Sequence, residues 1–179
     1  MITPLGPNVV GWAAQPGNWH CSLLASGEAP QPCRSVAALF AELYTANKPE
    51  AADRLLASHF INHEEAAERS PGPRGAKETA AWLHATFSDL RFDIEDVISD
   101  GASVVVRLTM SGRHTGAAGP FADMPVTGRS FRSRQIHIWR VSDGKVTDHW
   151  AVRDDLGWMT QLGLLSALNE SGQQNRAPT

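Results

Sequence analysis

The stretch "IHIWRVSDGKVTDHW", residues 136–150, predicts a β-hairpin. Apolar side chains alternate with polar ones on both sides of Ser-Asp-Gly at 142–144, and this tripeptide is a frequent turn sequence. The same three residues recur at 99–101, between "RFDIEDVIS" and "SVVVRLTMSGRHTG". The second half of the chain is therefore predicted to form antiparallel strands joined by two hairpins.

Upstream of these strands, apolar residues repeat at helical spacing. "SVAALFAELYTAN" begins with Ser35 as a candidate N-cap, and "KPEAADRLLA" and "AKETAAWLHATFSDL" predict two further helices around a short strand in "HFINHE". A closing helix in "DLGWMTQLG" should end at Gly163, because glycine is favoured just past a helix. Helices followed by antiparallel strands predict an α+β fold, in which a bent sheet and its covering helices enclose a concave pocket.

A chain of 179 residues suits one domain. Residues 1–34 are rich in Pro, Gly and Trp and are predicted to form an extended N-terminal arm. Residues 35–168 are predicted to be the folded domain, and the polar residues 169–179 a frayed tail.

Charge and motif content exclude several classes of function. The net charge of −3 gives no reason to expect a nucleic acid or a membrane as partner. No apolar run approaches the roughly 20 residues of a membrane span, and no secretory signal pattern is present, so we expect a cytoplasmic protein. Cys21 and Cys33 match no metal or redox spacing, and the other candidate ligands lack zinc-type spacing, so no metal is predicted.

Asp154 is the strongest candidate for chemistry. Uninterrupted strand alternation places it on the face of three apolar residues, Val146, Trp150 and Val152. Burial beside an indole would raise its pKa above the ordinary value of about 3.9, toward that of a useful base. The alternative is that Asp154 or Asp155 caps the helix that follows.

Three histidines lie on or near predicted strands. His137 faces away from Ile136 and Ile138, so it could orient the acid or a substrate oxygen, or be satisfied by packing alone. His114 shares its face with an apolar file and could line the pocket mouth or fix the glycine loop after it. His149 falls opposite the predicted acid and is expected to be exposed.

Aromatic side chains could wall a cavity for a flat ligand, although core packing is the alternative for most of them. The candidates are Trp82, Phe87, Trp139, Trp150 and Trp158.

The order of these motifs resembles that of the SnoaL-like polyketide cyclases, which share the nuclear-transport-factor-2-like fold. The resemblance covers residues 36–165 and rests on "FINHE", "SDGASVVVRLTMSGRHTG", "MPVTGRSF", "IHIWRVSDGKVTDHW" and "DDLGWMTQLG". It implies a conical barrel, in which a curved mixed or antiparallel sheet is wrapped by N-terminal helices around an apolar cavity.

The resemblance also implies a function. Asp154 matches the position of the family's acid/base, and His63 matches a polar pocket position at the end of the first strand. The implied reaction is an internal aldol-type cyclisation of a hydrophobic, carbonyl-bearing small molecule without a cofactor, in a homodimer or higher homo-oligomer. Two alternatives remain open: a hydrolase or hydratase with Asn62 and Arg107 helping to hold water, and a non-catalytic ligand-binding protein.

Overall fold

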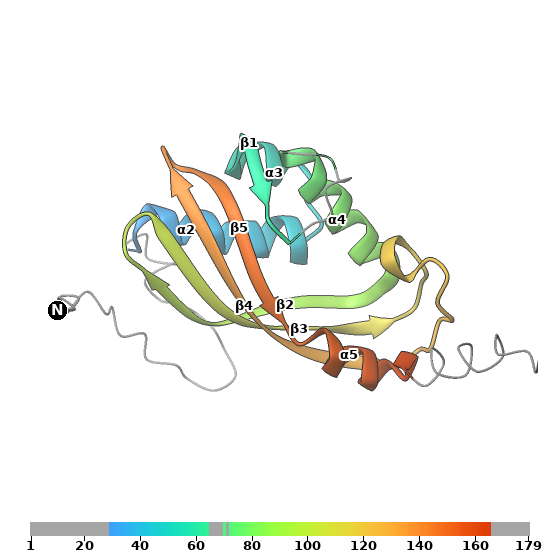
Figure 1. Ribbon diagram of the computed structural model, residues 1–179. Helices are drawn as coiled ribbons and strands as arrows, with labels where there is room; N and C mark the ends of the chain where they lie inside the picture. Colours follow the sequence, from blue (N-terminus) through green and yellow to red (C-terminus); the bar gives the residue numbers. More distant parts are fainter. Residues whose placement is uncertain (1–28, 65–69, 71, 166–179) are drawn as a thin grey trace, which may run out of the picture.

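The computed structural model describes residues 29–64, 70 and 72–165 (Figure 1). Most of the predicted arm and all of the predicted tail lie outside these residues. In chain order the elements are α2 (Gln31–Ala38), the π-helical segment η1 (Leu39–Thr45), α3 (Glu50–Leu55), β1 (Leu56–Asn62), α4 (Pro73–Thr86), β2 (Phe87–Ser99), β3 (Ser103–His114), the 3-10 turn η2 (Gly119–Phe121), β4 (Ser130–Ser142), β5 (Lys145–Arg153) and α5 (Asp155–Leu162).

The five strands form one sheet in the order β1-β5-β4-β3-β2. Strands β2 to β5 are an antiparallel meander, and β1 pairs in parallel with β5 at one edge. The two predicted hairpins are confirmed, since β2–β3 and β4–β5 turn at 99–101 and 142–144. The predicted α+β class with a curved mixed sheet is therefore confirmed, although the sheet stays open and does not close into a barrel.

Helices α2, α3 and α4 cover one face of the curved sheet, and α5 lies at the end of β4 and β5 (Figure 1). Val36, Leu39 and Leu43 are fully buried in one core cluster, which also includes Val106 and Leu108 of β3. The core thus lies between the N-terminal helices and the concave side of the sheet. Within the described residues, no helix combines the length and the apolar character that crossing a membrane requires.

Helix α2 begins five residues earlier than the sequence predicts, with Pro30 in place of Ser35 as its N-cap. Ser35 lies inside the helix, where its hydroxyl accepts a hydrogen bond of 2.8 Å from the Gln31 amide. The helix starts directly after Pro30, with Pro32 in its first turn, where the missing N–H of proline costs no helical bond. The closing helix α5 ends as predicted, because Gly163 adopts the left-handed conformation with φ 75°.

The Gly-x-His-x-Gly segment at the end of β3 packs closely against the elements around it. A side chain at Gly116 would place its Cβ only 2.0 Å from the carbonyl oxygen of Ala85, so only glycine fits there. His114 is fully buried, and its Nδ1 lies 3.2 Å from the Thr127 hydroxyl. The segment therefore ties β3 to the end of α4 and to the loop before β4.

Strand β5 contains a bulge that changes which residues face inward. Arg140 of β4 is opposite Asp148, but the next residue, Val141, is opposite Val146, so Thr147 is an extra residue. From His149 onward, the inward and outward faces are the reverse of those predicted by uninterrupted alternation from Val146.

Candidate active site

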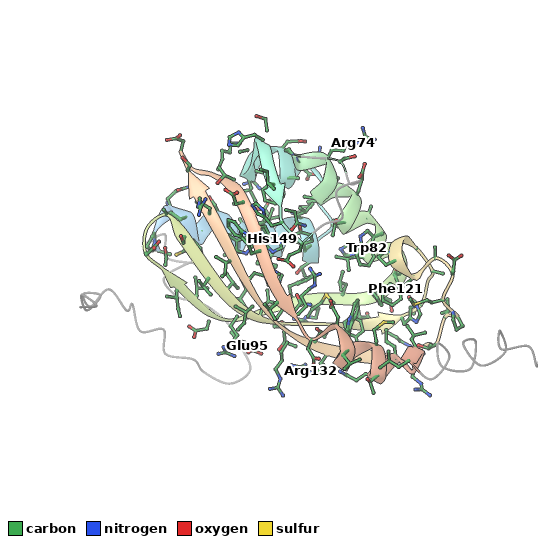
Figure 2. The ribbon with its side chains drawn as sticks, viewed as in Figure 1. Arg74, Trp82, Glu95, Phe121, Arg132 and His149 are labelled. Atoms are coloured by element: carbon green, nitrogen blue, oxygen red, sulfur yellow. The ribbon has the colours of Figure 1, made fainter. Side chains whose placement is uncertain are left out.

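A cavity of about 380 Å³ lies between the helices, the concave side of the sheet and α5. This volume is in the range of small-molecule sites. Its walls are mostly aromatic and aliphatic, and comprise Phe40, Tyr44, Trp82, Leu83, Phe92, Met110, Pro120, Phe121, Met124, Trp139, Trp158 and Met159. Figure 2 shows Trp82, Phe121 and His149 directed into this interior, whereas Glu95 and Arg132 point away from it.

Four polar side chains from β1, β4 and β5 form a hydrogen-bonded row in the cavity wall. Nδ1 of His149 lies 2.8 Å from Oδ1 of Asn62, Nδ1 of His137 lies 2.8 Å from Nε2 of His149, and Nε2 of His137 lies 2.9 Å from Oε1 of Gln135. We call Asn62, His149, His137 and Gln135 the amide–imidazole row. All four line the cavity, and the last three are buried.

Both imidazoles of the row are held in their neutral forms. Burial, together with the positive charge of Arg153, lowers the pKa of His137 to about 3. Burial also lowers the pKa of His149 well below its ordinary value, and His137, Arg153 and His63 add to this effect. The row is therefore uncharged at neutral pH when the cavity is empty.

Charged groups lie at another part of the cavity lining. Arg153 follows His149 and Ala151 on the inward face of β5, and its Nε lies 3.6 Å from Oδ1 of Asp155. Asp155 opens α5 and lies on the same helix face as Trp158 and Met159, which also line the cavity. Among the described residues that line the cavity, Asp155 and Glu64 are the carboxylates.

Asp154 has a different position from the one predicted. Its side chain is exposed and lies outside the cavity lining, and its Oδ1 accepts a 2.9 Å hydrogen bond from the Gly157 backbone N–H as the N-cap of α5. The bulge at Thr147 is the physical reason, since it turns Asp154 away from the concave face. The predicted exposure of His149 is wrong for the same reason, because this side chain is buried inside the cavity wall.

His63 and Trp150 lie on the outer side of the sheet and do not line the cavity. Their rings are stacked with centroids 4.3 Å apart, and Nε2 of His63 lies 3.0 Å from Oδ1 of Asp148. Burial would raise the pKa of Asp148, but hydrogen bonds from His63 and Thr147 and the charge of Arg140 hold it below its usual value. The pocket positions predicted for His63 and Trp150 are therefore wrong.

His114 and Phe87 also lie outside the cavity lining. Phe87 is buried in the core, with its ring against those of Phe131 and Trp158. By contrast, His137, Trp82, Trp139 and Trp158 line the cavity as expected in position; their roles toward a substrate stay predictions.

Comparisons with known proteins identify the family of this chain. The family model of the SnoaL-like polyketide cyclases matches residues 34–162. The chain belongs to this family. It is 35% identical over 127 residues to aklanonic acid methyl ester cyclase DauD of Streptomyces sp. (strain C5), an alignment that covers 68% of this chain and 76% of the relative. The prediction of a SnoaL-like cyclase is thus confirmed.

Two further relatives support the assignment. Nogalonic acid methyl ester cyclase of Streptomyces nogalater is 36% identical over 93 residues, which are 51% of this chain and 67% of the relative. The solved structure of TsrD from Streptomyces laurentii superposes with a TM-score of 0.67 at 26% identity, covering 74% of this chain and 95% of that chain. The likeness in both sequence and structure spans the domain that contains the cavity.

Several residues of this family member's cavity were missed by reasoning from sequence. Gln135 precedes His137 by two positions on β4, so strand alternation could have placed it in the cavity. His149 and Arg153 could not be placed without knowledge of the bulge, and Asp155 could not be placed without knowing which of the two adjacent acids caps α5. Arg107, expected near Asn62 in the water-holding alternative, instead faces outward and pairs with Glu95.

Proposed function

We propose that this cavity is an active site in which a carbonyl-rich, polyketide-like substrate closes a ring by internal aldol addition. The observation that carries the proposal is the combination of apolar walls with an Asp155–Arg153 pair and a neutral polar row on the same cavity. The proposal is supported by curated relatives whose names describe cyclases of aklanonic and nogalonic acid methyl esters.

The mechanism begins with Asp155 removing a proton from a methylene between two carbonyl groups. The resulting enolate oxygen accepts hydrogen bonds from the Arg153 guanidinium and from the Gln135 amide, which stabilise the developing charge. The apolar walls fold the substrate so that the enolate carbon meets an internal carbonyl, and this proximity supplies much of the rate. Asp155 then returns its proton to the new alkoxide.

The two neighbouring acids provide a matched test of this assignment. The full chain is incubated with aklanonic acid methyl ester, and ring closure is followed by chromatography and mass spectrometry. Asp155→Asn should lower kcat by about 10²- to 10⁴-fold, the usual contribution of a general base. Asp154→Asn should stay close to wild type, because asparagine caps a helix as well as aspartate does.

The opposite pattern, with Asp154→Asn inactive and Asp155→Asn active, would contradict the assignment of Asp155 and would identify Asp154, the residue predicted from the sequence, as the general base. Absence of ring closure by the wild-type chain on both the aklanonic and the nogalonic ester would contradict the proposed substrate class. Reaction in ¹⁸O-labelled water separates the hydrolase alternative, since an aldol cyclisation forms its product without taking an oxygen from solvent.

We further propose that a second copy of the chain covers the outer face of the sheet. Ile136 and Val152 are paired across β4 and β5 on this face, and Ile138 is their neighbour. Their exposed fractions are 47%, 76% and 42%, which leaves a contiguous apolar surface on the sheet.

The cytoplasmic location of the protein also stays a prediction.

A further inference from the structure

The amide–imidazole row contains three hydrogen bonds between four groups. Carboxamide oxygens face inward at both ends, Oδ1 of Asn62 toward His149 and Oε1 of Gln135 toward His137. The third bond joins the two imidazoles. With the heavy atoms in these positions, every donor hydrogen must come from an imidazole, because carbonyl oxygens only accept.

The number of protons in this arrangement is fixed by counting. Three hydrogen bonds need three N–H groups, whereas two neutral imidazoles carry two. The row therefore has two complete states. In the first state, one terminal carboxamide rotates by a half-turn and donates from its NH₂, and the two imidazoles together carry two N–H hydrogens. In the second state, both carboxamide oxygens stay directed toward the imidazoles, and the two imidazoles together carry three N–H hydrogens.

Gln135 is the amide that can turn. Oδ1 of Asn62 is held in place by a second hydrogen bond, 3.2 Å, from the backbone N–H of Glu64. The NH₂ of Gln135 has only distant partners, the Ser133 hydroxyl at 3.5 Å and the Met110 sulfur at 3.7 Å. A half-turn would let the Gln135 NH₂ donate to His137 and its oxygen accept from the Ser133 hydroxyl.

The empty cavity favours the state with two protons. Burial and the nearby Arg153 charge lower the pKa values of His137 and His149, so at neutral pH neither imidazole is charged. His149 then donates from Nδ1 to Asn62, and His137 donates from Nδ1 to His149. In this state Nε2 of His137 is the lone-pair site that accepts from Gln135.

We propose that the row takes up its third proton, at Nε2 of His137, when the anionic oxygen of an enolate or phenolate binds in the cavity. Gln135 then turns its NH₂ to the ligand oxygen and its carbonyl to His137. The imidazolium and the anion offset each other's charge, which avoids leaving a single uncompensated charge in a buried site. The inference deepens the proposed function and rests on it for the location of the ligand.

The proton balance of this step is simple. A ligand that arrives ionised takes no proton with it, so the third proton comes from solvent. A neutral phenol breaks its own O–H bond, keeps the electron pair and gives that proton to the row. When an enolate forms in the cavity, Asp155 takes the C–H proton and the third proton of the row again comes from solvent. In each case one N–H bond forms on His137, and no oxidation or reduction occurs. The titratable and charged groups around the row are Arg153, Asp155, Glu64, Tyr44 and His63.

Alizarin, a flat hydroxyanthraquinone whose colour reports its ionisation, is a suitable probe. Binding to the full chain is measured by calorimetry in two buffers of different ionisation enthalpy, at a pH where the free dye is ionised. We expect the bound dye to keep the colour of its anion and to bring close to one proton per molecule from solvent. Its dimethyl ether, which has the same ring system and cannot ionise, should bring none.

Binding of the coloured anion without proton uptake would overturn the inference, and so would binding of the neutral dye or no binding up to the dye's solubility. Ring closure is not measured in this experiment. A chain that binds the anion with its proton and closes no ring would contradict the proposed function alone, and a chain that closes the ring without proton uptake would contradict the inference alone.

Two variants add the same charge at opposite ends of the row. Gln135→Glu replaces a group that can donate with one that only accepts, so His137 must donate from Nε2 and the third proton should be present in the empty cavity. Asn62→Asp acts where the oxygen already accepts, so the row keeps its two protons. We expect ¹⁵N NMR at neutral pH to show an imidazolium in Gln135→Glu and neutral rings in Asn62→Asp.

An equal response of the two variants would mean that added charge alone sets the proton number, and the counting argument would fail. The wild-type chain gives a measurement that does not depend on the folding of either variant. Its ¹⁵N spectrum should show hydrogens on Nδ1 of both His137 and His149, and a hydrogen on Nε2 of either ring in the empty protein would contradict the assignment.

Discussion

At the scale of single residues, Asp154 and Asp155 show how adjacent acids take different positions. Asp154 accepts the Gly157 N–H as the cap of α5, and Asp155 starts the helix on the side of the cavity. Neighbouring helix positions are about 100° apart, so the two carboxylates cannot share one face. Both residues suit a helix start, so the sequence alone could not decide which of them caps it.

The capping role of Asp154 predicts a loss of stability that depends on the substituent. Asp154→Ala should lower the free energy of unfolding by about 1 kcal/mol, because an N–H at the start of α5 loses its acceptor. Asp154→Asn keeps an acceptor oxygen and should change little. Urea unfolding of both variants measures the difference, and equal stability of the alanine and asparagine variants would exclude the cap.

At the scale of elements, β4 and β5 differ in how far the sequence determines them. Burial alternates without interruption along the whole of β4, so the inward direction of His137 and Trp139 could be predicted from its pattern. On β5 the extra residue Thr147 reverses the faces of all later positions. Bulges arise from packing between strands and leave no clear local signal, so the partner of His137 was not foreseen.

The histidine pair across β4 and β5 makes stability depend on pH. The unfolded chain binds protons at His137 and His149 below about pH 6.5, whereas in the folded chain burial keeps the pKa of His137 at about 3. Their contribution is therefore complete above about pH 6.5 and is lost as the pH falls below it. The slope should reach about 1.4 kcal/mol per pH unit for each histidine.

Urea unfolding at pH 7.5, 6.5 and 5.5 measures this slope. His137→Phe should reduce it, and His59→Gln, which changes an exposed histidine, should leave it unchanged. A wild-type slope near zero between pH 6.5 and 5.5 would show that the buried pair is protonated in the folded chain.

At the scale of the whole molecule, an open sheet has two faces, and the helices cover one of them (Figure 1). The hairpin signals and helical periods were enough to predict the helices, the two hairpins and the α+β class, because they are local. The parallel pairing of β1 with β5 joins distant parts of the chain and was not predicted from these signals. The cavity lining was not predictable to the same degree, since it combines residues from β1, β4, β5 and α5 that meet only in the folded chain. The outer face of the sheet keeps its apolar side chains exposed, and we propose that a second copy of the chain covers them.

The proposed second copy predicts a dimer that depends on this face. Ile138→Glu places a charge in the centre of the apolar surface and should convert the dimer to a monomer in sedimentation velocity experiments. Val126→Glu is the matched control, since Val126 is a comparably exposed apolar residue, 52%, in the loop before β4. A wild-type chain that sediments as a monomer at tens of micromolar would contradict the proposal.

The indole of Trp139 is stacked on the His149 ring with centroids 3.9 Å apart. An imidazolium quenches the fluorescence of a neighbouring indole more strongly than neutral imidazole does. The ring of His137 is also stacked with this indole, with centroids 6.0 Å apart. The emission of this buried tryptophan should therefore fall when the histidine pair takes up a proton, which would be an optical signal that needs no label.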